Sequence, residues 1–199
     1  MPHNFSNEDI DAVREILNIG IGRSAMMLNK ITKSHITLSI PQIRIFHIDE
    51  IESVKDSFLQ QKSAIVKLDF GGDFCGTTAV LFPPDSAAKL VMAITGEDAG
   101  TPELDSLRAE TVKEIGNIIL NGVMGSVGNI LKTHIKYSVP NYGEDTIIGL
   151  VKSSSKSLDK YVLMATACFN VKDLNVEGNI VMLLEIGSMK VLLDKINRI

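Results

Sequence analysis

The chain has 199 residues, an apolar share of 45%, a charged share of 22% and a net charge of −4, values typical of one globular domain or two small fused ones. It has no Trp, few aromatic residues and an acidic balance. These features argue against nucleic-acid binding, which needs stacking side chains and basic surfaces. The first residues lack the basic and apolar regions of a signal peptide, and no apolar run is long enough for a membrane span. We therefore expect a cytoplasmic protein without membrane insertion.

The first predicted element is a long helix that begins behind Ser6 or Asn7, either of which can cap it, and ends at about Asn29. At ~100° per residue its apolar side chains form one buried stripe. The polar residues share a second arc, and two apolar residues beside that arc are expected to be exposed. The stripe contains Ile10, Val13, Leu17, Ile21 and Leu28, the polar arc Asp11, Glu15, Asn18 and Gly22, and the exposed pair Ile19 and Met26.

A polar helix face with apolar neighbours has two interpretations. It is typical of a surface on which another protein docks, and it is equally typical of a solvated helix face. A single Glu-x-x-Asn does not separate them.

The rest of the first half predicts strands and one short helix. Residues 34–40 alternate as a half-buried strand that stops at Pro41, because proline cannot donate to a ladder. An extended segment follows, then a loop or short helix, a hairpin around Gly71-Gly72-Asp73, a helix opened by two prolines, and a polar boundary. These elements cover residues 42–48, 49–61, 64–70 with 75–82, 83 to about 95, and 96–102.

The second half repeats the first at an offset of 99 residues, from Asn18 to Asn117. In each copy 22 residues separate the asparagine from a proline, Pro41 or Pro140. A second long helix, capped by Asp105 or Ser106, carries a second polar arc. Strands, a hairpin and a short helix then follow in the same order. The arc contains Glu110, Glu114, Asn117 and Asn121, and the later elements cover residues 133–139, 161–170 with 178–186, and 188–196.

This order predicts an α+β fold. We expect a pseudo-two-fold repeat of long helix, antiparallel strands and short helix, sharing one largely antiparallel sheet. Neither half has enough apolar surface to fold comfortably alone. Residues 1–199 are therefore predicted to form a single domain made of two pseudo-repeats, about 5–96 and 104–199.

The polar arcs limit the chemistry. Side chains at i, i+4 and i+7 of a helix can enter one cleft, but the set holds no nucleophile beside a base. The sequence also lacks the G-x-S-x-G, phosphate-loop and H-E-x-x-H motifs. An amide can hold a water molecule and a carboxylate can pair with a partner's lysine. Such groups could complete an active site that belongs to another protein.

The repeated pattern [DS]-x-x-x-E-x-x-N-x22-P resembles the CheC/CheX/FliY family of phosphatases, which act on phosphorylated response regulators of chemotaxis. The resemblance covers nearly the whole chain, and two copies without an appended module favour a CheC-like member. It implies a phosphorylated CheY-type receiver domain as partner and substrate. CheD, a receptor deamidase that CheC relatives bind, is a further candidate partner.

The resemblance also assigns roles by position. Glu15 and Glu114 would form a salt bridge with the receiver's active-site lysine, and Asn18 and Asn117 would orient the attacking water. Asp11 and Glu110 would support the two sites. The receiver would supply Mg²⁺, so no cofactor or metal of the chain's own is expected. His35 and His134 recur, but His3 and His47 complete no ligand set, so the recurring pair is interpreted as structural.

Two residues depart from the family pattern. Glu110 stands where the family has Asp or Ser, and Leu17 replaces the glycine that the second copy keeps as Gly116. Because Leu17 belongs to the buried stripe, we interpret it as a packing change. Both sites are expected to work, and the second is the weaker candidate. The alternative is a non-catalytic interaction protein, either a flagellar-switch-like binder of CheY or a regulator of CheD.

Overall fold

A seven-stranded sheet, antiparallel in every pairing, runs through the part of the chain that this computed structural model describes, residues 5–32, 35–51, 57–96, 103–154, 160–171, 174–196 and 198. The strands are β1 (Ile36–His47), β2 (Ser63–Gly71), β3 (Gly76–Phe82), β4 (Lys136–Tyr137), β5 (Asn141–Asp145), β6 (Lys160–Val171) and β7 (Leu174–Glu185). The helices are α1 (Asn7–Thr32), α2 (Pro84–Thr95), α3 (Glu103–Ile130), α4 (Ile147–Ser154) and α5 (Ile186–Ile196), with short 3-10 turns at Ile48–Glu50 and Ser57–Gln60.

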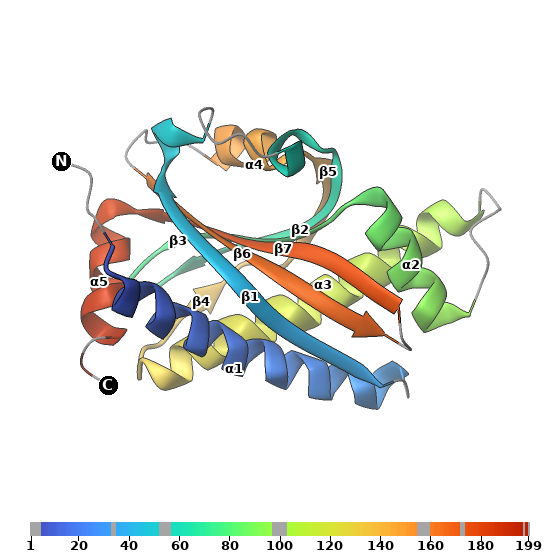
Figure 1. Cartoon of the computed structure of the whole chain (residues 1–199), viewed down its shortest axis with the longest axis horizontal. Coiled ribbons are helices and arrows are strands. Elements are labelled where there is room, and N and C mark those ends of the chain that lie inside the picture. The colour runs from blue at the N-terminus through green and yellow to red at the C-terminus, as the bar shows by residue number, and fades with distance from the viewer. Residues whose placement is uncertain are drawn as a thin grey trace.

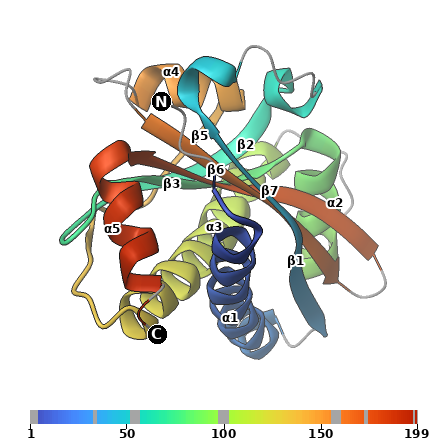
Figure 2. The same ribbon diagram turned by 60° about the vertical axis from the view of Figure 1, so that its left-hand side comes forward.

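The helices form layers on the two faces of the sheet. Figures 1 and 2 show α1, α2, α3 and α5 on one face and α4 on the other. Side chains alternate between the layers as the strand period requires: Val66 and Leu68 join the core beneath α1 and α3, whereas Ile65 joins the core beneath α4. None of the described helices combines the length and the apolar character that crossing a membrane demands.

The order of the strands carries the repeat. It runs β1-β6-β7-β3-β2-β4, with β5 also paired to β2. By their place in the two halves, β2 is equivalent to β6, and β3 is equivalent to β7. When the order is read from the other end, each of these strands takes the place of its equivalent. At the centre Ala79 of β3 faces Val181 of β7. The predicted α+β fold, with a pseudo-two-fold repeat on one antiparallel sheet, is confirmed.

The beginning of α1 is confirmed, and that of α3 is corrected. Ser6 caps α1: its Oγ accepts the Asp9 N–H at 3.1 Å, and the Asp9 carboxylate accepts the Ser6 N–H at 3.0 Å. Helix α3 begins at Glu103, so Asp105 and Ser106 lie inside it and neither is the cap.

The prolines after the motifs have different consequences in the two halves. Strand β1 continues through Pro41 because a register shift between Ser39 and Gln42 leaves the proline outside the ladder. The prediction that the strand stops there is wrong. The expected strand over residues 133–139 is reduced to β4, and β5 follows Pro140. Helix α4 was not predicted.

Helices α1 and α3 cross at small residues. A Cβ on Gly20 would lie 2.6 Å from the Val123 Cα, and a Cβ on Gly122 would overlap the Ser24 Oγ. The buried Ser24 hydroxyl donates to the Gly20 carbonyl at 3.0 Å. Glycine therefore lets the two motif helices touch through their backbones.

Candidate functional site

The first copy of the motif lies on an accessible face of α1. Glu15 is exposed. Asp11 is also exposed and pairs with Arg14 on the same helix, with Oδ1 and Nη2 2.6 Å apart. The neighbours Ile19 and Met26 are 42% and 59% exposed, so the predicted orientation of this face is confirmed.

Asn18 is anchored to the sheet. Its side chain is half-buried, and its Oδ1 accepts the backbone N–H of Ile40 at 2.9 Å. Ile40 is 2% exposed and directly precedes Pro41. The spacing of 22 residues between asparagine and proline therefore has a physical meaning in this copy: it brings the edge strand back to the asparagine.

Asn29 holds the same strand nearer its start. Its Oδ1 accepts the Ile36 N–H at 2.5 Å, and its Nδ2 donates to the Ile36 carbonyl at 3.1 Å. Together the two asparagines fasten β1 along α1, which fixes the orientation of the Asn18 amide.

The second copy of the motif lies on α3. Glu110 and Glu114 are exposed and Asn117 is half-buried. The Asn117 Oδ1 accepts a hydrogen bond from the Asn121 Nδ2 at 2.6 Å, one helical turn further on. The position equivalent to Ile40 is Val139, which is 85% exposed and lies between β4 and β5. The same amide thus has a strand donor in one copy and a helix donor in the other.

A hollow of about 460 Å³ opens beside Glu110 and Glu114. Its apolar wall comes from three helices and contains Leu28, Ile31, Ile94, Ile115 and Ile118. A separate void of about 10 Å³ lies in the core, where α1, α3 and α5 pack on the sheet. The residues around that closed space include Val13, Ile16, Leu17, Leu192 and Ile196.

Leu17, which replaces the glycine of the family pattern, is buried, and this agrees with its interpretation as a packing change. Leu17 is a buried member of the core beneath α1. A Cβ on its counterpart Gly116 would lie 2.6 Å from the Val66 Cβ. Helix α3 therefore approaches β2 more closely than a side chain at position 116 would permit.

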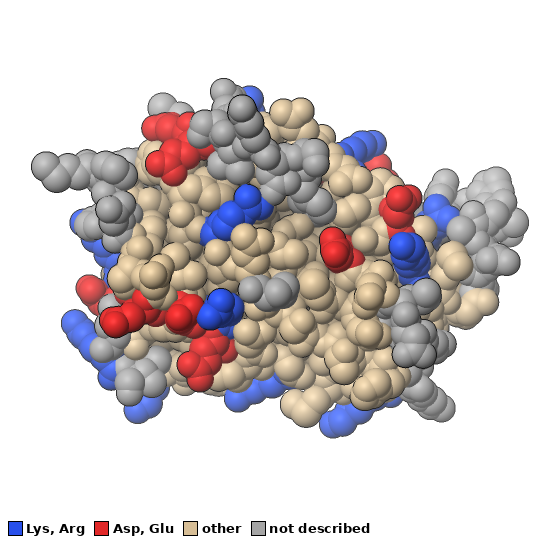
Figure 3. All heavy atoms as spheres, in the orientation of Figure 1, with Lys and Arg blue, Asp and Glu red and all other residues tan. Residues whose placement is uncertain are grey.

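Charge on this side of the molecule is uneven. In Figure 3 acidic side chains gather on the left, over the beginning of α1, and the surface over its later turns is mostly uncharged. Glu8 and Asp9 belong to the first turn of α1, and Met26, Met27 and Ile31 are the exposed apolar residues of the later turns. An acidic end beside an apolar surface suits a protein partner that carries both basic and apolar groups.

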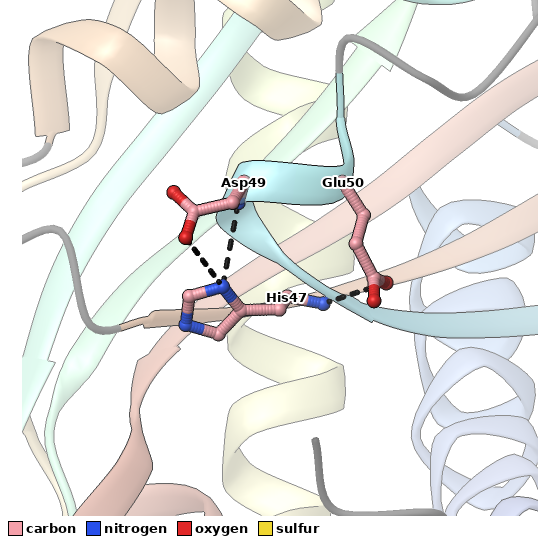
Figure 4. Close-up of polar contacts among 3 residues, drawn as sticks. All are labelled: His47, Asp49 and Glu50. Carbon is pink, nitrogen blue, oxygen red and sulfur yellow. Dashed lines mark hydrogen bonds and ion pairs between the residues drawn. The ribbon is translucent and has the colours of Figure 1, made fainter. Parts of the chain in front are cut away.

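Among the histidines that the structure describes, His47 has a structural role. His47 caps the turn Ile48–Glu50: its Nδ1 accepts the Asp49 N–H at 3.4 Å, and the Glu50 carboxylate accepts the His47 N–H at 3.3 Å (Figure 4). His35 and His134 are exposed. Within the described residues, no group of three or more His, Cys, Asp or Glu is placed to hold a metal ion.

Asn121 was seen in the sequence as a member of the polar arc, but no role was assigned to it. Its spacing of four residues from Asn117 was the available signal, since such pairs are neighbours on a helix. The bond between Asn18 and Ile40 had no comparable local signal, because it joins segments 22 residues apart.

Comparison with known proteins finds curated relatives and solved structures that are similar to this chain. No family model matches the chain. The CheY-P phosphatase CheC of Bacillus subtilis (strain 168) is 21% identical over 165 residues, covering 79% of this chain and 77% of that protein.

The similar structures share the fold. FliY of Thermotoga maritima superposes with a TM-score of 0.75 at 18% identity, covering 98% of both chains. The FliM middle domain from H. pylori gives 0.61 at 11% identity, covering 96% of this chain and 99% of that one. A chain of the CheX-CheY-BeF3-Mg+2 complex from Borrelia burgdorferi gives 0.54 at 16% identity, covering 88% and 99%. The resemblance to the CheC/CheX/FliY family is thus confirmed for the fold.

Proposed function

We propose that this chain is a cytoplasmic phosphatase that removes phosphate from the aspartyl phosphate of a CheY-type receiver domain. The observation that carries the proposal is the pair of equivalent helix faces. In each, an exposed glutamate lies one turn before a half-buried asparagine whose carbonyl oxygen already accepts one hydrogen bond. The similarity to a CheY-P phosphatase supports the same assignment.

The glutamates act in docking. Glu15 and Glu114 are exposed, so each can reach a lysine in the receiver's active site and set the register of the helix on it. Asp11 is partly neutralised by Arg14, which limits its repulsion of a phosphate. Glu110, which replaces the shorter residue of the family pattern, is exposed and can turn toward water.

The asparagines act in the chemical step. Phosphoryl transfer requires little covalent chemistry from the protein, so catalysis comes from positioning and electrostatic stabilisation. An amide whose oxygen is already held presents its Nδ2 group in one orientation. It then needs no reorganisation when it binds the attacking water. The receiver contributes the Mg²⁺ and most of the groups around the phosphate.

A non-catalytic switch protein is the second candidate, because the FliM middle domain shares this fold. Two intact Glu/Asn pairs favour the enzyme, since a binding protein has no evident use for duplicated, oriented amides. Regulation of CheD stays a prediction.

The experiment is the decay of a phosphorylated CheY-type receiver, freed of its phosphodonor, with and without this protein and without ATP. We expect substoichiometric protein to shorten the half-life of the phosphoryl group. If the half-life is unchanged at stoichiometric protein and binding is observed in the same samples, the phosphatase proposal is wrong and the non-catalytic switch protein is favoured.

A further inference from the structure

The two motif asparagines obtain the same hydrogen bond from unrelated donors. Asn18 receives it from the Ile40 backbone at 2.9 Å, and Asn117 from the Asn121 side chain at 2.6 Å. Each copy lacks the donor of the other. The position equivalent to Asn121 is Gly22, which has no side chain, and the position equivalent to Ile40 is the exposed Val139.

This bond determines which end of the amide points outward. Rotation of an asparagine amide exchanges an acceptor oxygen for an NH₂ donor, and the two orientations are otherwise similar in energy. A donor directed at the oxygen selects one of them. In the first copy the donor is a backbone group of the sheet, and in the second it is the Nδ2 group of Asn121.

Resting on the proposed function, we propose that Asn121 is a positioning residue of the second site, which holds the Asn117 amide with its Nδ2 group toward the receiver. Asn121 is exposed and one turn beyond Asn117, so it can orient the amide without entering the receiver's active site. An ordinary pair of polar side chains on a helix surface would affect stability slightly and catalysis not at all.

The test isolates the second site with Asn18→Ala and measures receiver dephosphorylation at several receiver concentrations. Adding Asn121→Ala should lower kcat about 3- to 10-fold, the equilibrium effect of one hydrogen bond, and leave KM within about twofold. Asn121→Asp, which keeps the shape but cannot donate when ionised, should lower kcat at least as much. Asn121→Gln, which can still donate, should restore part of the rate.

Two controls separate positioning from folding. Asn129→Ala, at another exposed asparagine of α3, should leave kcat unchanged. Asn121→Ala added to Asn117→Ala should lower activity no further than Asn117→Ala does, because the residue acts through Asn117.

The outcomes distinguish the two proposals. An active Asn18→Ala protein whose kcat does not respond to Asn121→Ala or Asn121→Asp overturns the positioning role and leaves the phosphatase standing. An inactive wild-type protein overturns the phosphatase, and the positioning role with it. Loss of all activity on Asn18→Ala alone shows that the second site is silent, which also overturns the role of Asn121.

Discussion

The two copies of the motif present the same polar residues, but different parts of the structure hold them. In the first, a strand of the sheet holds Asn18. In the second, α3 borders an open hollow, and Asn117 is held within its own helix. Duplication followed by divergence would preserve the residues that meet a partner and allow the packing behind them to change. The comparison therefore separates what the motif requires from what merely surrounds it.

The difference originates in the edge strands. In the first half β1 has 12 residues and passes along α1, whereas β4 in the second half has two. Val139, at the place in the second copy that corresponds to Ile40, lies between β4 and β5 and is exposed. In the second copy the hydrogen bond to the Asn117 Oδ1 comes from the Asn121 side chain.

The largest expected effect concerns the division of labour inside each copy. With Asn117→Ala present, adding Asn18→Ala should lower the dephosphorylation rate ~10²-fold or more, equivalent to about 2.7 kcal/mol, and leave receiver affinity nearly unchanged. Adding Glu15→Ala instead should mainly weaken affinity. Single-turnover decay and a binding titration measure the two quantities. Equal losses of rate and affinity for the asparagine would contradict the assigned roles.

The contact that joins the two copies can be broken at Gly20. Gly20→Ala should lower the free energy of unfolding by about 1–3 kcal/mol, because its methyl group would overlap the Val123 backbone. Gly22→Ala, two residues further on, has nothing within 4 Å of its Cβ in the described structure. It should be neutral or raise stability by up to about 1 kcal/mol, because alanine is the better helix former. Urea unfolding compares the variants, and equal stabilities would argue against the close crossing.

Because Asn18 and Asn117 are held by different groups, replacing them with alanine should lower the free energy of unfolding by different amounts. Asn18→Ala leaves the buried Ile40 N–H without its partner, which should cost about 1–3 kcal/mol. Asn117→Ala removes a bond between two accessible side chains and should cost less than about 0.5 kcal/mol. The measurement is chemical unfolding of both single variants. A larger loss for Asn117→Ala would reverse the comparison.

The smallest effect concerns a link from α5 to the β2–β3 turn. The Lys195 Nζ lies 2.9 Å from the Asp73 carboxylate, which also accepts the Thr133 hydroxyl at 2.7 Å. The hydrogen bond from Lys195, then that from Thr133, lowers the pKa of Asp73 below its ordinary value of 3.8. Asp73→Asn should therefore lower Tm slightly at pH 7. The difference should disappear as pH falls from 3.8 through the lower folded pKa, since a carboxylate with a depressed pKa stabilises only while it is ionised.

Sequence reasoning succeeded where local rules decide. The bounds of α2 follow from its prolines and Gly96, and the exposed motif faces follow from helical periodicity. It failed where distant contacts decide. Whether a strand stops or bulges at Pro41 depends on its partner β6, and the hollow beside Glu114 depends on how three helices meet. The exposure of the motif residues could thus be predicted, whereas the groups that hold them could not.

The central claim is that both copies catalyse the same reaction. Its most direct test is the decay of one phosphorylated receiver preparation with the wild-type protein, Asn18→Ala, Asn117→Ala and the double variant, each shown to be folded. We expect each single variant to retain part of the activity and the double variant to retain none above the receiver's own rate of dephosphorylation. Activity in the double variant would contradict it, as would complete loss in either single one.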